Sequence, residues 1–356
     1  MQVDPVLARA FSERADGARD TSVPLVGLFG EGVPLPLIAA MGGQGIDVKA
    51  PPLTDPEDGP MVDQVTRATE DFMDSFATRF LHRFADGAFD RYAALIFARD
   101  DVAGLAAYQY ALELRRQGLV PARGPQLHLW NLLHTGSAPA MRFNRTELDR
   151  LIAMLSAVLG ARLDLDRLAA ALAAEERRAV ALAALPPGGE TAFVARNAGR
   201  WMTPEDHVAR LEPPAREGAD RRIALVGTAC DIPVLHRLCA EFGTIVADLQ
   251  DYGRIVPQPR TGEPLDMLRR IAGDPLCLRA APPARFTRAL REGTGDADLV
   301  IATVNRNDDA LGWELPGLRM QVESRGGRFI DLGFLPFRPD AAWIDGARAR
   351  VAEALS

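Results

Sequence analysis

Apolar runs of strand length alternate with helical patterns in two separate stretches of the chain. In the first stretch the short apolar runs cover residues 23–29, 46–53, 92–98 and 126–133. Phenylalanines recur every three to four positions within residues 70–86, and a second helix is predicted over 102–117. Strands that alternate with helices of this length indicate a parallel sheet in an α/β domain.

The same alternation returns near the C-terminus, after a stretch with no strand pattern. Residues 145–217 show a strong 3.6-residue periodicity, which predicts helices. Asp164 is expected to cap one of them, and Thr146 or Asn144 the helix before it. Strands are then predicted at 222–229, 244–251, 296–305 and 328–334, and a last helix from about 340.

The predicted fold class is therefore α/β, with two Rossmann-like parallel-sheet domains and a helical connecting segment. The expected division is an N-terminal helix or arm at 1–20, a first α/β domain at 21–140, the helical segment at 141–220 and a second α/β domain at 221–356.

Composition narrows the function classes. Of 356 residues 47% are hydrophobic and 25% charged, which is typical of a globular protein, and the net charge of −7 argues against nucleic acid as a partner. No apolar run reaches the length of a membrane span, and no signal peptide is visible at the N-terminus. The odd, sparse set Cys230, Cys239 and Cys277 favours a reducing, cytoplasmic setting.

Few local motifs point to chemistry. The glycines after the first strand do not have nucleotide-binding spacing. Cys230 follows a strand at the start of a predicted helix, where a thiol pKa falls, but a small residue at the edge of a core is the alternative. The pairs Asp100–Asp101 and Asp308–Asp309 both follow predicted strands, at the end where α/β proteins bind ligands. Helix N-caps or solvated loops are the alternative for them.

Several segments together resemble the benzoyl-CoA reductase and 2-hydroxyacyl-CoA dehydratase subunit family. The segments extend over nearly the whole chain; they read VGLFGEGVPLPLIAAMGG, MTPEDHVARL, RIALVGTACDIPVLHRLCAEFGTIVADLQDYG and LVIATVNRNDDALGWELPGL. That family holds a [4Fe–4S] cluster on three cysteines and acts on acyl-CoA thioesters as a lyase or an oxidoreductase. It commonly pairs two related subunits and receives an electron from an ATP-dependent activator.

The resemblance places the three cluster positions on Asp74, Asp101 and Asp308, the last with Glu314 and Pro316 in register. None is cysteine, so no [4Fe–4S] cluster is expected. Carboxylates are ligands for divalent metals, and we expect the three to meet in a cleft between the domains. A divalent cation, Arg99 and Arg306, or protons retained at raised pKa values could offset their repulsion, and Cys230 could approach the same site.

What the resemblance implies is a 2-hydroxyacyl-CoA dehydratase-like or benzoyl-CoA reductase-like subunit that acts on or binds an acyl-CoA-type substrate in the cleft. The alternatives are a non-catalytic partner of a cysteine-bearing paralogue and a small-molecule binding protein without turnover. A homodimer or a heterodimer with a paralogue is expected, and an ATP-dependent activator is a further partner that the resemblance implies. The substrate and the catalytic residues stay open.

Overall fold

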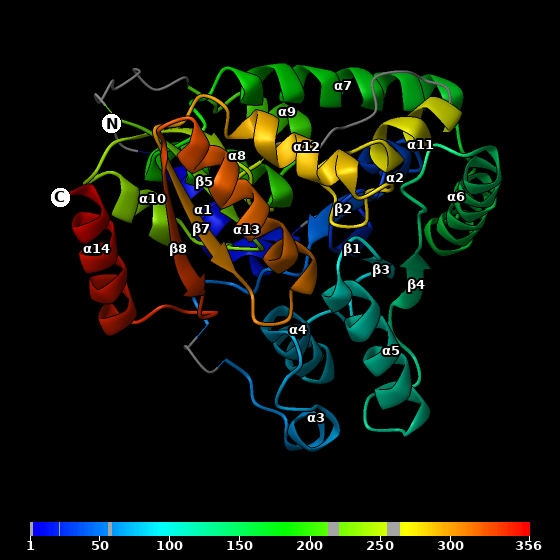
Figure 1. Cartoon of the computed structure of the whole chain (residues 1–356). Coiled ribbons are helices and arrows are strands. Elements are labelled where there is room, and N and C mark those ends of the chain that lie inside the picture. Colours follow the sequence, from blue (N-terminus) through cyan, green and yellow to red (C-terminus); the bar gives the residue numbers. More distant parts are fainter. Residues whose placement is uncertain (1–2, 21, 56–58, 213–220, 255–263) are drawn as a thin grey trace.

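Two four-stranded, all-parallel sheets form the framework, which confirms the predicted α/β class (Figure 1). The computed structural model describes residues 3–20, 22–55, 59–212, 221–254 and 264–356. Residues 1–2 of the predicted arm and the predicted boundaries at 21 and 220 lie outside these ranges.

The first sheet has the order β2-β1-β3-β4. Its strands are β1 (Leu25–Phe29), β2 (Gln44–Asp47), β3 (Ala94–Ala98) and β4 (Gln126–Trp130). The helices of this part are α1 (Pro5–Glu13), the 3-10 helix η1 (Arg14–Asp20), α2 (Leu35–Ala40), α3 (Asp63–Ala68), α4 (Ser75–Ala85) and α5 (Val102–Arg116).

The second sheet has the equivalent order β6-β5-β7-β8. Its strands are β5 (Arg222–Gly227), β6 (Thr244–Asp248), β7 (Leu299–Val304) and β8 (Arg328–Phe334). Its helices are α10 (Val234–Cys239), α12 (Ala284–Gly293), α13 (Asp309–Ser324) and α14 (Ala341–Leu355). The helix α11 (Pro264–Ala272) follows β6 in sequence but packs with α2 and α6 in the core of the first sheet.

A helical segment lies between the two sheets in sequence. It contains α6 (Ala138–Leu159), α7 (Leu165–Ala183), α8 (Glu190–Ala198), the 3-10 helix η2 (Gly199–Trp201) and α9 (Pro204–Val208). Asp164 caps α7 as predicted, by accepting from the backbone N–H groups of Asp166 and Arg167. The prediction for α6 was wrong: Ser137 is its cap, and the Asn144 side chain lies inside the helix, where it bonds both backbone groups of Leu133.

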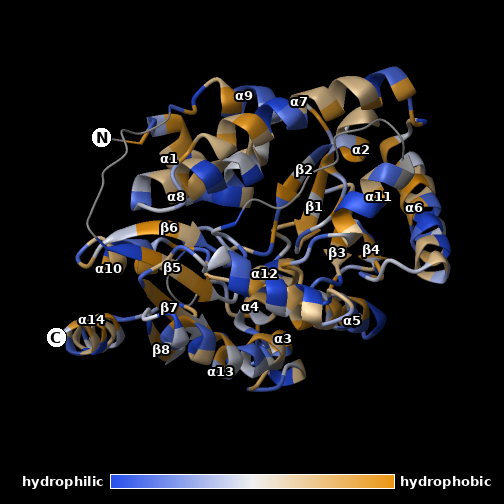
Figure 2. Cartoon of the chain, turned by 45° about the horizontal axis from the view of Figure 1, so that its top comes forward, coloured by the Kyte–Doolittle hydropathy of each residue, from blue (hydrophilic) through white to orange (hydrophobic). Residues whose placement is uncertain are grey.

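The central strands are buried on both faces, and this explains why their sequences are apolar throughout. In the first sheet, Phe29 and Phe97 pack in one core with α4 and α5, whereas Val26 and Ile96 pack in another with α2 and α6. Figure 2 shows the same distribution as hydrophobic strands beneath helices of mixed hydropathy. No described helix has both the length and the apolar character that a membrane crossing requires.

The strand predicted over 46–53 begins and ends earlier than expected, at Gln44 and Asp47. The Asp47 carboxylate accepts from the N–H groups of Lys49 and Ala50, at 2.8 and 3.1 Å, and this turn ends the strand. Lys49 therefore lies just beyond the sheet.

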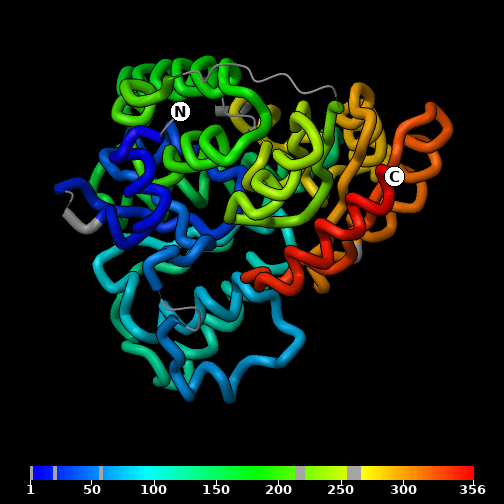
Figure 3. Tube along the Cα trace, turned by 90° about the vertical axis from the view of Figure 1, so that its left-hand side faces the viewer, coloured from blue at the N-terminus to red at the C-terminus, as the bar shows by residue number. Residues whose placement is uncertain are grey.

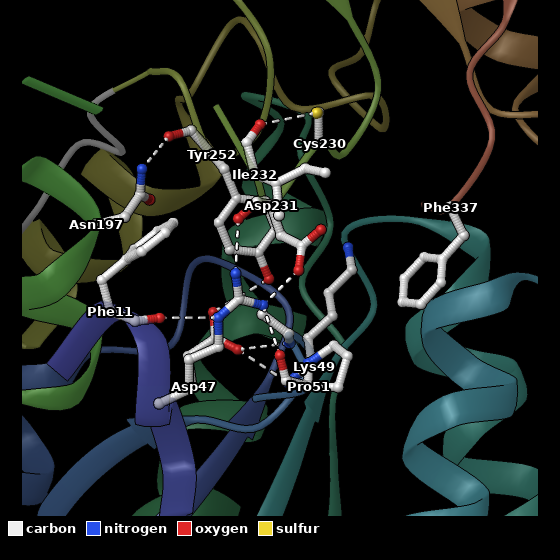
Figure 4. Close-up of polar contacts among 12 residues, drawn as sticks. Phe11, Asp47, Lys49, Pro51, Asn197, Cys230, Asp231, Ile232, Tyr252 and Phe337 are labelled. Carbon is white, nitrogen blue, oxygen red and sulfur yellow. Dashed lines mark hydrogen bonds and ion pairs between the residues drawn. The ribbon is translucent and has the colours of Figure 1, made fainter. Parts of the chain in front are cut away.

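The N-terminal arm is tied to the second sheet through Arg14, whose side chain is fully buried. Its guanidinium forms an ion pair with Asp231, which follows β5, and donates to the backbone oxygens of Phe11 and Pro51. Arg338 binds the same carboxylate at 2.8 Å. Figure 4 shows Phe11, Pro51 and Asp231 around this contact, and in Figure 3 the blue arm lies beside the green helical segment.

We expect Arg14→Ala to lower the free energy of unfolding by about 3–5 kcal/mol, because it leaves the buried Asp231 carboxylate with one partner instead of two. Chemical denaturation measures this loss. The matched control is Arg9→Ala on the same arm, which removes an exposed pair with Glu13 and should cost at most ~0.5 kcal/mol. Equal losses in both variants would contradict the role assigned to Arg14.

Candidate functional site

The carboxyl ends of the central strands place the candidate site. In each sheet the strand order reverses between two neighbours, β1 and β3 in the first and β5 and β7 in the second. Such reversal points leave room for a ligand beyond the strand ends. Asp100 and Asp101 follow β3, and Asn305 and Asp308 follow β7.

All three aspartates singled out by the resemblance are helix N-caps. Asp74 caps α4, by accepting from Phe76 N at 2.9 Å and Ala77 N at 3.1 Å. Asp101 caps α5 through Gly104 N at 2.9 Å, and Asp308 caps α13 through Leu311 N at 3.1 Å. The alternative interpretation of the two aspartate pairs, that they cap helices, is therefore confirmed for Asp101 and Asp308.

The structure nevertheless brings the three caps to the wall of one cavity of about 270 Å³, here called the aspartate cavity. Each cap uses its Oδ1 atom for the helix. The charged side chains that line it, besides Arg279, are Lys49, Asp74, Asp100, Asp101, Asp251 and Asp308. Five carboxyl groups from both α/β halves thus line one cavity.

Hydrogen bonds hold the walls in place. Asn305, after β7, donates its amide to Asp74 Oδ2 at 2.7 Å and so joins the second half to the first. Asp100 accepts from the backbone N–H of Glu31 at 2.6 Å. Gly30 lies against this carboxylate with a φ of 101°, and a Cβ there would come within 2.6 Å of Asp100 Oδ1, so only glycine fits.

Lys49 is the only lysine of the chain, and its side chain is 4% exposed. Its ammonium donates to Asp101 Oδ2 at 2.6 Å. Burial alone lowers a lysine pKa, but the neighbouring carboxylates, Asp101 first, hold the pKa of Lys49 well above its usual value. Lys49 is therefore a permanent cation in the wall and not a neutral nucleophile.

Burial raises the pKa of a carboxyl group, whereas it lowers that of a lysine. It raises the pKa of Asp74, Asp100 and Asp251 above the ordinary value, and the charge of Asp101 adds to the effect in all three. For Asp308, burial and the neighbouring carboxylates raise the pKa to about 6. Raised pKa values are one of the ways expected to offset the repulsion between these carboxyl groups.

The arginine network expected from Arg99 and Arg306 does not form. In the described part of the chain neither makes an ion pair with these aspartates: Arg99 donates to Asn131 at 3.3 Å, and Arg306 lies over the Phe334 ring. Lys49 supplies the neutralising contact instead, because the turn after β2 directs it toward the end of β3. Among the described residues Glu314, in α13, lines neither this cavity nor the one beside it.

The residues of the site do not fit an iron–sulfur cluster. Cys230 donates to the backbone oxygen of Ile232, as Figure 4 shows, and lines a neighbouring cavity. Burial raises the pKa of the Cys230 and Cys277 thiols to about 12, so neither is a thiolate. Within the described ranges, no group of three His, Cys, Asp or Glu side chains is arranged to hold a metal ion. Lys49 and Asn305 already take the free oxygens of Asp101 and Asp74.

Four residues of the site could not be identified from the sequence alone. Lys49, Thr228, Asp251 and Asn305 line the cavity but belong to no recognisable motif. The one usable sign was that Lys49 is the sole lysine among 41 basic residues. Comparison of the chain with protein-family models and with curated protein sequences gives no significant match.

We expect Lys49→Met to lower the free energy of unfolding at pH 7 by about 3–5 kcal/mol, because the Asp101 carboxylate loses its buried partner. The measurement is a double-mutant cycle by chemical denaturation. In an Asp101→Asn background the same lysine substitution should cost much less, since no carboxylate is left unpaired. Costs that are simply additive would show that the pair is not coupled.

A second prediction concerns Asp308 and pH. A carboxyl group whose pKa is raised in the folded state loses its stabilising contribution as the pH rises through the folded value. Asp308→Asn keeps the cap and cannot ionise. The variant should therefore gain stability over the parent between about pH 4 and 6, and the gain should level off above that range.

Unfolding free energies measured across this pH range test the prediction. Asp340→Asn is the matched control, because Asp340 caps α14 at an exposed position away from the cavity. A gain of the same size and pH dependence in the control would contradict the assignment to Asp308.

Proposed function

We propose that the aspartate cavity is a substrate site, and that the chain is a cluster-free protein of the 2-hydroxyacyl-CoA dehydratase and benzoyl-CoA reductase type that binds the acyl end of an acyl-CoA-type ligand there. The observation that carries the proposal is the meeting of Asp74, Asp101 and Asp308 with Lys49 around one cavity at facing strand ends. The sequence resemblance supports the ligand class.

The electrostatics of the cavity support a neutral, oxygen-rich acyl group. Carboxyl groups that retain protons donate hydrogen bonds to carbonyl and hydroxyl oxygens, and the remaining carboxylates accept from a hydroxyl group. Asp101 already forms an ion pair with the Lys49 ammonium. A ligand carboxylate in the same cavity would therefore be repelled by Asp101 without gaining Lys49 as a partner. The proposal therefore favours a thioester over the corresponding free acid.

The chemistry assigned to the residues is proton transfer. Asp308 has a pKa of about 6 and so exchanges its proton near neutral pH, which suits a general acid or base. Its Oδ1 atom accepts from Leu311 N, and the backbone N–H of Ala310 also interacts with this carboxylate. The Oδ2 atom of Asp101 already accepts from the Lys49 ammonium, at 2.6 Å.

A non-catalytic role is the second candidate, as a partner subunit or a binding protein. The observation in its favour is that Asp74, Asp101 and Asp308 all cap helices, so each has a structural reason to be present. Binding of the acyl group would be the same in this case, without proton exchange at the ligand.

The test uses two neutral thioesters, lactoyl-N-acetylcysteamine and its deoxy analogue propionyl-N-acetylcysteamine, titrated by calorimetry. We expect the hydroxyacyl thioester to bind about tenfold more tightly, since one further hydrogen bond contributes about 1 kcal/mol. Binding should be tighter at pH 5.5 than at pH 7.5, because Asp308 holds its proton below about pH 6. Free lactate should bind weakly.

Asp308→Ala should abolish the preference for the hydroxyl group, while Asp340→Ala, which also removes a helix cap, should leave it unchanged. Absence of binding by both thioesters would overturn the proposal. Deuterium uptake at the thioester's Cα in heavy water, followed by NMR, separates the candidates: uptake that depends on the cavity residues indicates a catalyst, and binding without uptake indicates the non-catalytic role.

A further inference from the structure

A second cavity lies between helix α7 and β2, which is an edge strand of the first sheet. Its volume is about 290 Å³, and we call it the α7 cavity. The residues of α7 that line it share one face of the helix and are Ala171, Ala174, Glu175, Arg178, Ala179 and Leu182. Figure 1 shows α7 above α2 and β2. The α7 cavity and the aspartate cavity have no described lining residue in common.

Contacts at two places along this face fix the position of α7. Leu168 and Leu172, near the start of the helix, pack against Ala40 of α2 in one small core. Further along, Arg178 donates to the backbone oxygen of Gly199 in η2, at 3.0 Å. Alanines from α7 and glycines from the side of β1 and β2 line the space, and they have too little side chain to fill it. The cavity is therefore a fixed part of the fold.

The wall of the α7 cavity is mainly apolar. Besides the alanines of α7, its apolar side chains include Leu28, Val33, Leu35, Leu182 and Met202. A polar group placed against them would lose its hydrogen bonds to water, so a molecule that fills the space must be largely apolar. The volume is close to the lower limit of ~300 Å³ for small-molecule sites, which indicates a small ligand.

The charged groups in the wall balance one another. Four carboxyl groups and four guanidinium groups line the cavity: Glu31, Asp47, Glu175 and Glu205 against Arg178, Arg196, Arg200 and Arg254. Arg200 binds Glu31 at 2.5 Å, and Arg178 binds Glu175 at 2.6 Å. An ionised ligand would lose its hydration here and meet no excess of opposite charge. The balance therefore favours a neutral ligand.

Glu175 provides a hydrogen-bond acceptor in this wall. Its side chain is 4% exposed, and its Oε2 atom, which protein atoms enclose, binds Arg178. The other oxygen, Oε1, is accessible and accepts no hydrogen bond from the described residues. A buried carboxylate oxygen without a donor is costly, and a hydroxyl group of a bound molecule would supply the missing donor.

We propose that the α7 cavity is a second ligand site, which binds a small, neutral, largely apolar molecule whose hydroxyl group donates to Glu175 Oε1. The site goes beyond the proposed function and does not depend on it. The turn after β1 connects the walls of the two cavities. The backbone N–H of Glu31 donates to Asp100 in the aspartate cavity, while the Glu31 side chain binds Arg200 in the wall of the α7 cavity.

The first experiment compares three ligands of similar size by calorimetry on the full chain. They are n-hexanol, its isomer methyl pentyl ether, which has no O–H donor, and the hexanoate anion. We expect n-hexanol to bind at least tenfold more tightly than either of the others, because the ether lacks the hydrogen bond to Glu175 and hexanoate carries a charge. Equal binding of the ether would overturn the role of Glu175, and equal binding of hexanoate would overturn the neutral ligand class.

The second experiment locates the bound n-hexanol. Ala171 lines the cavity and is half-buried, so the longer side chain of Ala171→Leu would occupy part of the space. Alanine and leucine have similar helix propensities, so the variant should fold like the parent, which thermal melting checks. We expect it to weaken n-hexanol binding at least tenfold.

Ala173→Leu is the matched control, because it makes the same change at an exposed position of the same helix. It should alter n-hexanol binding less than twofold. An equal loss in both variants, no loss in Ala171→Leu, or absence of n-hexanol binding by the parent would overturn the site. The thioester titrations test the aspartate cavity alone, so each proposal can fail without the other.

Discussion

The ion pair between Lys49 and Asp101 is the contact on which the candidate site depends. Five carboxyl groups line one cavity, and like charges at such short range repel one another. The buried Lys49 ammonium reduces that repulsion, and burial raises the pKa of Asp74, Asp100 and Asp251. The cavity wall therefore combines one buried cation with carboxyl groups that bind protons more tightly than free aspartate does.

Helix capping and site formation are parts of one arrangement in this protein. A parallel strand ends shortly before the next helix begins, so a capping aspartate after β3 or β7 lies at the carboxyl end of the sheet. Asp101 and Asp308 are such caps, whereas Asp74 caps α4, which follows another helix. Each of the three uses Oδ1 for the cap, and Oδ2 of Asp101 and of Asp74 then accepts from Lys49 and Asn305.

The two α/β halves are joined by polar contacts between buried or half-buried side chains. Asn305 donates to Asp74 at the cavity, and Arg14 and Arg338 both bind Asp231, which follows β5. Such contacts are directional, and losing one partner leaves a buried polar group unsatisfied. They hold the facing strand ends in one relative position, which keeps the acids from both halves around a common space.

The sequence by itself determined the fold class, because apolar runs and helical periodicity reflect burial along the chain, and it singled out Asp74, Asp101 and Asp308 through motif order. The sequence placed the N-cap of α7 correctly at Asp164 but missed Ser137 as the N-cap of α6. The first turns of α6 mix polar and apolar residues, so the hydrophobic pattern does not show where that helix begins. Only the tertiary structure selected Lys49, Asp251 and Asn305 as residues of the cavity. That selection depends on which loops meet beyond the strand ends, and no local pattern of residues encodes contacts between segments 52 positions apart, as for Lys49 and Asp101, or 231 apart, as for Asp74 and Asn305.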